Sequence, residues 1–185
     1  MITRMSRINK TKYTILGMLA IRPMSGYEMQ SMIKKTIANF WSESAGQIYP
    51  NLAKSLKEKL ITAEDDSYNG KRKSKIYSLT EKGLKVLQDW LPKPAERHQV
   101  RDELLLKLFF GKNLSCEQYE KLIHKRKQST EEKLEFLNSI KKHLQKEHKN
   151  EEDPPYWLIT IDHGLHMAKA ELEWCSEVLK NIKNK

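Results

Sequence analysis

The chain has 185 residues, enough for one large domain or two small ones with their own cores. It is 38% hydrophobic and 31% charged, and its seven glycines and six prolines are too few for long disordered or collagen-like regions. No apolar run approaches the ~20 residues that span a bilayer, and the N-terminus lacks a signal-peptide core. Cys116 and Cys175 form no CxxC pair, so we expect reduced thiols, a cytoplasmic location and no membrane partner.

The net charge of +10 is concentrated in the first half of the chain. Residues 1–92 contain 16 Lys and Arg against 8 Asp and Glu, a net +8, whereas residues 93–185 contain 18 against 16. A basic module beside a nearly neutral one favours polyanion binding, although a basic surface can also serve solubility alone.

Apolar spacing predicts two helices before residue 40. The first covers residues 11–21 and ends at Pro23, with an inward face of Ile15, Leu16, Leu19 and Ala20. Ser25 and Glu28 have the spacing of a capping box and predict the start of the second helix. Its predicted buried face consists of Met29, Met32, Ile33 and Ile37.

A third helix is predicted in SESAGQIYPNLAKSLKEKL, residues 42–60. Its apolar stripe is Ile48, Leu52, Leu56 and Leu60, but Pro50 lies inside the pattern, where proline costs roughly 3 kcal/mol. We therefore expect this helix to begin only just before Pro50 and to end near Lys59. Gln47, Tyr49 and Asn51 would then surround a helix N-terminus, which favours an anion.

The period next changes from helical to alternating. Two strands are predicted, Leu60–Glu64 and Lys75–Leu79, around the hairpin-turn signal Asn69-Gly70. The tip is basic and continues through Lys71, Arg72, Lys73, Ser74 and Lys75. Three helices followed by a hairpin is the order of a winged helix-turn-helix, in which a basic wing contacts phosphates. A basic loop with no role in binding is the alternative.

The rest of the chain is predicted to be helical. Thr80 can cap a fourth helix to about Leu91, and Pro92 and Pro94 mark a boundary between a winged-helix domain, 1–92, and a helical domain, 93–185. Helices are then expected over Val100–Phe110, from a cap at Ser115 to about Asn150, and after Pro154-Pro155. The fold class is mainly α, with a two-stranded wing.

The last helix has two apolar stripes. One has heptad spacing and is expected to form a dimer interface: Leu158, Ile161, Leu165, Ala168, Leu172, Cys175, Leu179 and Ile182. The second lies on a neighbouring face: Trp157, Gly164, Met167, Trp174 and Val178. One stripe can pack within the chain and the other against a second copy, which predicts a homodimer. An intramolecular bundle that buries both stripes is the alternative.

Several segments resemble the PadR-type transcriptional regulators. TKYTILGML, MSGYEM, SAGQIYPNLAKSLKEKLI and SKIYSLTEKG resemble the winged-helix domain of that family, and RDELLLKLFF and YWLITIDHGLHMAKAELEWC resemble the helical domain of its larger subgroup. The resemblance runs in order from about Lys12 to Leu179. It implies a homodimeric, DNA-binding repressor of bacterial type, and it offers phenolic acids or other planar aromatics as an effector class.

Physical chemistry indicates where DNA contacts should fall. Gln47 and Asn51 can read base edges, whereas Ser25, Tyr27 and Tyr49 can donate hydrogen bonds to phosphates. Lys54, Lys71, Arg72, Lys73 and Lys75 should add salt-sensitive affinity for double-stranded DNA. A candidate pocket for an aromatic effector consists of Arg101, Trp157, His163, Met167 and Trp174, with ordinary dimer core as the alternative.

Other functions find less support. His163 and His166 lie three residues apart, with His143 and His148 on the preceding helix, but zinc needs at least three converging ligands, so we expect no metal and no cofactor. No nucleophile motif, P-loop or GxGxxG is present, and an enzyme is not expected. A protein–protein adaptor built on the helical tail, and an RNA-binding winged helix, remain as alternatives to the repressor.

Overall fold

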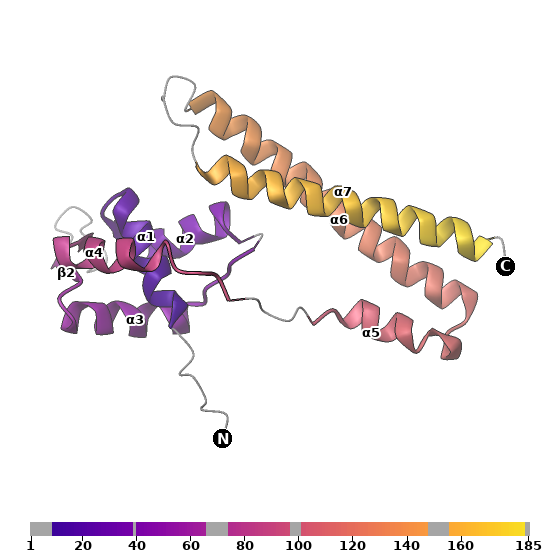
Figure 1. Ribbon diagram of the computed structural model, residues 1–185, viewed down its shortest axis with the longest axis horizontal. Helices are drawn as coiled ribbons and strands as arrows, with labels where there is room; N and C mark the ends of the chain where they lie inside the picture. The colour runs from indigo at the N-terminus through magenta and orange to yellow at the C-terminus, as the bar shows by residue number, and fades with distance from the viewer. Residues whose placement is uncertain (1–8, 39, 66–73, 97–100, 148–155, 184–185) are drawn as a thin grey trace. The chain divides into compact units, whose positions relative to one another are not determined.

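The structure is a computed structural model that describes residues 9–38, 40–65, 74–96, 101–147 and 156–183 (Figure 1). The chain divides into two compact units, Met1–Glu96 and Arg97–Lys185. Within the described residues, no helix is long and apolar enough to cross a membrane. The fold is mainly helical with one small sheet, as the sequence predicted.

The N-terminal unit has the order of elements of a winged helix. Its elements are α1 (Lys10–Ile21), β1 (Met24–Ser25), α2 (Gly26–Thr36), α3 (Ala45–Lys57), β2 (Ile61–Asp65), β3 (Lys75–Leu79) and α4 (Glu81–Trp90). The two predicted strands form an antiparallel pair with Thr62 opposite Ser78. No local pattern predicted β1, which pairs with β3 on its other edge. The predicted turn at Asn69-Gly70 lies outside the described residues.

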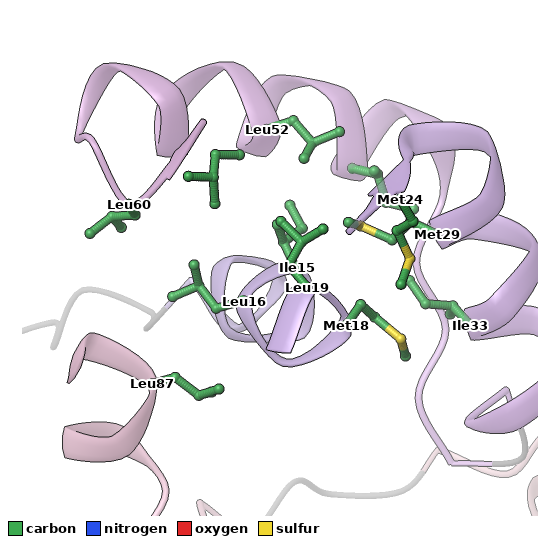
Figure 2. Close-up of a cluster of buried hydrophobic side chains, with 12 residues drawn as sticks. Ile15, Leu16, Met18, Leu19, Met24, Met29, Ile33, Leu52, Leu60 and Leu87 are labelled. Atoms are coloured by element: carbon green, nitrogen blue, oxygen red, sulfur yellow. The ribbon is translucent and has the colours of Figure 1, made fainter. Parts of the chain in front are cut away.

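The core of this unit surrounds α1. Figure 2 shows Ile15 and Leu16 of α1 between Leu52 of α3 and Leu87 of α4. Met24, Met29 and Ile33 close the same cluster from β1 and α2. Ala20, which was expected to face inward, is exposed, and Met18 is buried instead. The predicted inward face was therefore wrong at one position of α1.

The third helix begins at Ala45, five residues before Pro50 and so earlier than predicted. The capping contacts explain this start, because the side-chain oxygen of Gln47 accepts hydrogen bonds from the backbone N–H and the hydroxyl of Ser44, both at 2.9 Å. Pro50 lies inside the helix on its exposed side. The carbonyl that loses its partner is that of Gly46, an exposed residue in the first turn, where water can replace the missing N–H.

The C-terminal unit consists of a short helix and a helical hairpin. Its elements are α5 (Glu103–Phe109), a 3₁₀ turn at Gly111–Asn113, α6 (Cys116–Glu147) and α7 (Tyr156–Lys183). The predicted cap at Ser115 is present, because its hydroxyl accepts from the N–H of Gln118. α6 and α7 run antiparallel side by side, and an ion pair of 3.1 Å joins Lys141 to Asp162 between them (Figure 1).

The heptad stripe of α7 is buried within the chain. Ile161, Leu165, Ala168, Cys175 and Leu179 are each at most 8% exposed, and Leu158, Leu172 and Ile182 are half-buried. Ile161 and Leu165 cluster with Leu137 of α6, and Cys175 and Leu179 cluster with Ile123 of α6. Burial raises the pKa of the Cys175 thiol. One chain therefore already covers the surface that the heptad pattern assigned to a dimer.

Candidate nucleic-acid interface

The outward face of α3 carries mostly polar and basic side chains. Ile48, Leu52 and Ser55 are buried, and the opposite side chains are exposed: Gln47, Tyr49, Pro50, Ala53, Lys54 and Lys57. Burial of one side thus fixes which residues a bound partner meets. Lys57 was not among the predicted contacts. It lies three residues after Lys54, which was predicted, and on the same exposed face of the helix.

Tyr49 lies against the start of α2. A Cβ atom built on Gly26 would lie only 2.9 Å from Cε1 of Tyr49, so glycine lets the ring lie in its present position. Ser25 and Tyr27 flank Gly26; Ser25 is half-buried and Tyr27 is 76% exposed. The hydroxyl of Ser25 accepts from the N–H of Glu28 at 3.2 Å and also hydrogen-bonds to the Glu28 carboxylate, so it would exchange that partner for a phosphate. Three of the predicted phosphate donors are therefore neighbours.

The two predicted base readers are engaged within the chain. Gln47 accepts from Ser44, and Asn51 is half-buried, donating to the carbonyl of Gln47 at 2.8 Å and accepting from the side chain of Asn9. Bidentate pairing with adenine needs the amide oxygen as an acceptor. The Gln47 oxygen, which already accepts two hydrogen bonds, would have to exchange an internal partner for a base, whereas Asn51 keeps one acceptor and one donor position.

The basic residues beside α3 are exposed. Lys54 lies 3.9 Å from Glu58 in an exposed ion pair that constrains it little, and Lys75 is exposed at the start of β3. Lys71, Arg72 and Lys73 lie outside the described residues. The face therefore offers hydrogen-bond donors and lysines on one side of one helix, as a polyanion requires.

Comparison with known proteins places this arrangement in a family. The profile described as "Transcriptional regulator PadR-like family" matches residues 15–89, and that described as "Virulence activator alpha C-term" matches residues 100–183. The negative transcriptional regulator PadR of Bacillus subtilis (strain 168) is 37% identical over 131 residues, which cover 68% of this chain and 70% of that protein. The chain belongs to the PadR-like family of transcriptional regulators.

Solved PadR structures have the same fold over nearly the whole chain. Bacillus subtilis PadR in complex with operator DNA has a TM-score of 0.81 at 30% identity, covering 92% of this chain and 98% of that one. Bacillus subtilis PadR in complex with p-coumaric acid has a TM-score of 0.74 at 28% identity, covering 93% and 98%.

The candidate effector residues of this PadR-like chain divide between two places. Trp157 and Trp174 are 17 residues apart on α7, about 25 Å along the helix axis, so a pocket for one small molecule cannot hold both from a single chain. His163 and Met167 are exposed between them. Trp174 is half-buried and packs against the cluster of Ile123, Cys175 and Leu179.

An ion-pair network holds α5 at the Trp174 end of this unit. Asp102 accepts two hydrogen bonds from Arg126 of α6, at 2.7 and 2.9 Å, and Arg126 also donates to Glu171 of α7 at 3.2 Å. The same carboxylate caps α5 at the N–H groups of Leu104 and Leu105. The hydrogen bonds from Arg126 lower the pKa of Asp102 most strongly. Arg101 precedes Asp102 and is exposed. Its backbone therefore lies at the Trp174 end of the unit, far from Trp157.

The histidines form no metal centre among the residues described, where no three His, Cys, Asp or Glu side chains converge. His163 is exposed, and His166 has its Nδ1 2.8 Å from the backbone oxygen of Asp162. His148 lies outside the described residues.

Proposed function

We propose that this PadR-like regulator is a homodimeric repressor in the cytoplasm that binds a pseudopalindromic operator in double-stranded DNA and performs no catalysis. The observation that carries the proposal is the exposed face of α3 in a winged-helix domain. Gln47, Tyr49, Lys54 and Lys57 lie together on this face. In such domains the recognition helix enters the major groove with its N-terminal residues at the base edges. The operator complex of Bacillus subtilis PadR supports this role.

The contacts divide by chemistry. Tyr49, Tyr27 and Ser25 supply hydroxyl donors for phosphates, and the lysines of α3 and the wing supply affinity that falls with salt. Gln47 can accept from a base only by releasing an internal partner, whereas Asn51 keeps one acceptor and one donor position. Exposed side chains on the same helix, such as Pro50 and Ala53, can add base readout by contacting thymine methyl groups.

A second copy of the chain covers the apolar surface that one chain leaves open. Because the heptad stripe is already buried, we place the dimer contact mainly on α5 and on the outer side of α7. Exposed apolar side chains there are Leu105 at 54%, Leu106 at 60%, Phe109 at 82%, Phe110 at 58%, Ile159 at 66% and Met167 at 57%. Such a density of exposed large side chains marks an interaction surface. A symmetric dimer also matches a pseudopalindrome.

A planar aromatic acid is the proposed effector, and it releases DNA. The p-coumaric acid complex of Bacillus subtilis PadR supports this class of ligand. Of the candidate residues, Arg101 and Trp174 form the pair that one chain holds at the same end of the helical unit, and Arg101 supplies a cation for a carboxylate. Trp157, His163 and Met167 would contribute from the second chain.

The repressor proposal is tested by binding to duplex DNA from the region upstream of the protein's own gene, with a scrambled duplex as control, across a salt series. We expect a preference of at least ~10³ for the native duplex, with affinity that falls steeply as salt rises. Equal, weak binding to both duplexes would contradict a specific regulator at this site. Absence of binding at low salt would favour the adaptor.

The effector is tested by titrating the same protein–DNA complex with p-coumaric acid and, as a control, with a non-aromatic carboxylic acid of similar size. Release of DNA by the aromatic acid alone is expected. An operator affinity that stays unchanged in saturating p-coumaric acid would overturn the proposed ligand while leaving the DNA-binding proposal intact.

A further inference from the structure

A buried carboxylate lies immediately before the recognition helix. Glu43 is 6% exposed and directly precedes Ser44, the N-cap of α3. Its carboxylate accepts hydrogen bonds from the indole Nε1 of Trp41 at 2.8 Å and from the hydroxyl of Thr11 at 3.0 Å. The hydroxyl of Thr14 lies 3.3 Å from it and equally far from the backbone oxygen of Lys10, so its one proton is shared between the two acceptors. Packing of an apolar core does not require a carboxylate here, because burying one is costly unless it is well hydrogen-bonded.

The three donors come from two different places in the fold. Thr11 and Thr14 are one turn apart on α1, whereas Trp41 belongs to the connection between α2 and α3. One carboxylate thus ties this connection to the first half of α1. The side-chain hydrogen bond from Asn9 to Asn51 forms a second tie between the start of α1 and α3. The N-terminal end of α3 is therefore held against α1 by polar groups at two points.

Directional contacts at this end have a different effect from the apolar core beneath the helix. The burial of Ile48 and Leu52 holds α3 on the domain, but apolar burial is non-directional and tolerates a small rotation or slide of the helix. Hydrogen bonds weaken steeply when their angle or distance changes. Hydrogen bonds to base edges require the same precision from the helix that presents them, whereas contacts to phosphates position a protein without reading sequence.

We propose that Glu43 is a positioning residue for sequence-specific DNA recognition, which fixes the N-terminus of α3 against α1 through Thr11, Thr14 and Trp41. The inference rests on the proposed DNA-binding function. It makes the choice of sequence, and not general attraction to DNA, depend on a side chain that a duplex bound to the outer face of α3 does not touch. Glu43 acts through the helix that follows it.

The test compares affinities for the native upstream duplex and a scrambled duplex. We expect Glu43→Ala to bind the native duplex about tenfold more weakly, while its affinity for the scrambled duplex changes by less than about twofold. Glu43→Gln should recover most of the loss, because the amide oxygen can still accept from Trp41 and its N–H can donate to the hydroxyl of Thr11. A role that needed only the negative charge would not be rescued by Gln.

A stability-matched control separates positioning from simple destabilisation. Leu87→Ala leaves a cavity in the same core but on α4, away from the cap of α3. At a temperature where both variants are folded, Leu87→Ala should retain the native-to-scrambled affinity ratio. An unchanged ratio in Glu43→Ala, or an equal fall in both variants, would overturn the inference.

Two further measurements keep the inference testable if Glu43→Ala does not fold. Trp41→Phe removes one donor but keeps an aromatic ring, and it should lower the same ratio by a smaller factor. In Trp41→Phe, amide hydrogen exchange should accelerate, relative to the wild type, more in the first turn of α3 than in α1. Unchanged exchange together with an unchanged affinity ratio in this variant would contradict the proposal. If the wild-type protein itself shows no preference for the native duplex, the proposed function fails, and that result is distinct from a failure of Glu43.

Discussion

Gly83 shows at the residue scale how closely α4 approaches the sheet. A Cβ atom at this position would lie 2.1 Å from the backbone oxygen of Leu60 and 2.8 Å from Cδ1 of Leu79. Because a backbone oxygen cannot swing aside, Gly83→Ala must displace the first turn of α4 and strain its cap at Thr80. We expect a loss of about 2 kcal/mol or more in the free energy of unfolding, measured by urea denaturation.

Gly17 is the matched control for this substitution. It lies within α1, and a Cβ atom there would meet nothing within 4 Å. Gly17→Ala should raise the free energy of unfolding by up to about 1 kcal/mol, since alanine is the better helix former. If both substitutions changed the free energy of unfolding equally, the predicted clash with the backbone oxygen of Leu60 would be wrong.

Gly26 makes a separate prediction about DNA binding. A Cβ atom there would press on the ring of Tyr49, at 2.9 Å from Cε1, but this ring is 48% exposed and can move outward. Gly26→Ala should therefore change stability little and weaken operator binding severalfold, because Tyr49 leaves the position that meets DNA. Tyr49→Phe, which keeps the ring and removes the hydroxyl, separates the two contributions in the same binding assay.

At the scale of single elements, α5 depends on one carboxylate. Asp102 caps α5 and pairs with Arg126, and its pKa is lowered in the folded state, chiefly by the hydrogen bonds from Arg126. A group with a lowered folded pKa stabilises the fold fully above its unfolded pKa, about 3.9, and this contribution is lost as the pH falls through the folded value. Asp102→Asn should cost about 1–2 kcal/mol near neutral pH.

The loss should be measured by amide hydrogen exchange in α5 and α6, which reports locally. We expect the difference between Asp102→Asn and the wild type to shrink below about pH 4, as the wild-type carboxyl takes up its proton. Glu103→Gln is the control, because Glu103 pairs with Lys107 on the exposed surface and should have little effect. A difference that persisted unchanged at low pH would contradict the role given to the ion pair.

The sequence predicted elements better than their contacts. The capping box at Ser25, the caps at Ser115 and Thr80 and the alternation over Leu60–Glu64 and Lys75–Leu79 are local signals, and the structure confirms a helix or strand at each. The start of α3 was wrong because the interactions of Ser44 and Gln47 outweigh the local penalty of Pro50. β1 is only two residues long and exists because β3 lies beside it, which no local pattern encodes.

The candidate site was predictable only in part, for a similar reason. The exposed stripe of α3 follows from helical periodicity, so Tyr49 and Lys54 were predicted as contacts, and the structure leaves both exposed. The role proposed for Glu43 depends on Thr11 and Thr14, about thirty residues earlier, and an internal partner of Asn51 is Asn9. Contacts between residues so distant in sequence appear only once the fold is assembled. The heptad of α7 likewise shows that a stripe must be buried without showing which chain buries it.

At the scale of the whole molecule, the two units serve different parts of DNA recognition in the proposed repressor. The first unit has the basic excess, and the second is nearly neutral but exposes large apolar side chains on α5. A single winged helix reads only a few base pairs, so specific affinity depends on joining two of them. In the proposed dimer, the linked second copy would raise the effective concentration of its DNA-binding face, and this gain would be lost on dissociation.

Disrupting α5 should therefore change both assembly and DNA binding. Leu106 and Phe109 are 60% and 82% exposed, so Leu106→Ser with Phe109→Ser should leave the fold of the chain intact. We expect sedimentation to show a shift from dimer to monomer, and affinity for the native duplex to fall by about tenfold or more. Leu91→Ser, at an exposed apolar residue of the first unit, is the control and should remain dimeric. A double variant that stays dimeric would place the contact elsewhere, on the outer side of α7, and Ile159→Ser with Met167→Ser would then be the pair that dissociates.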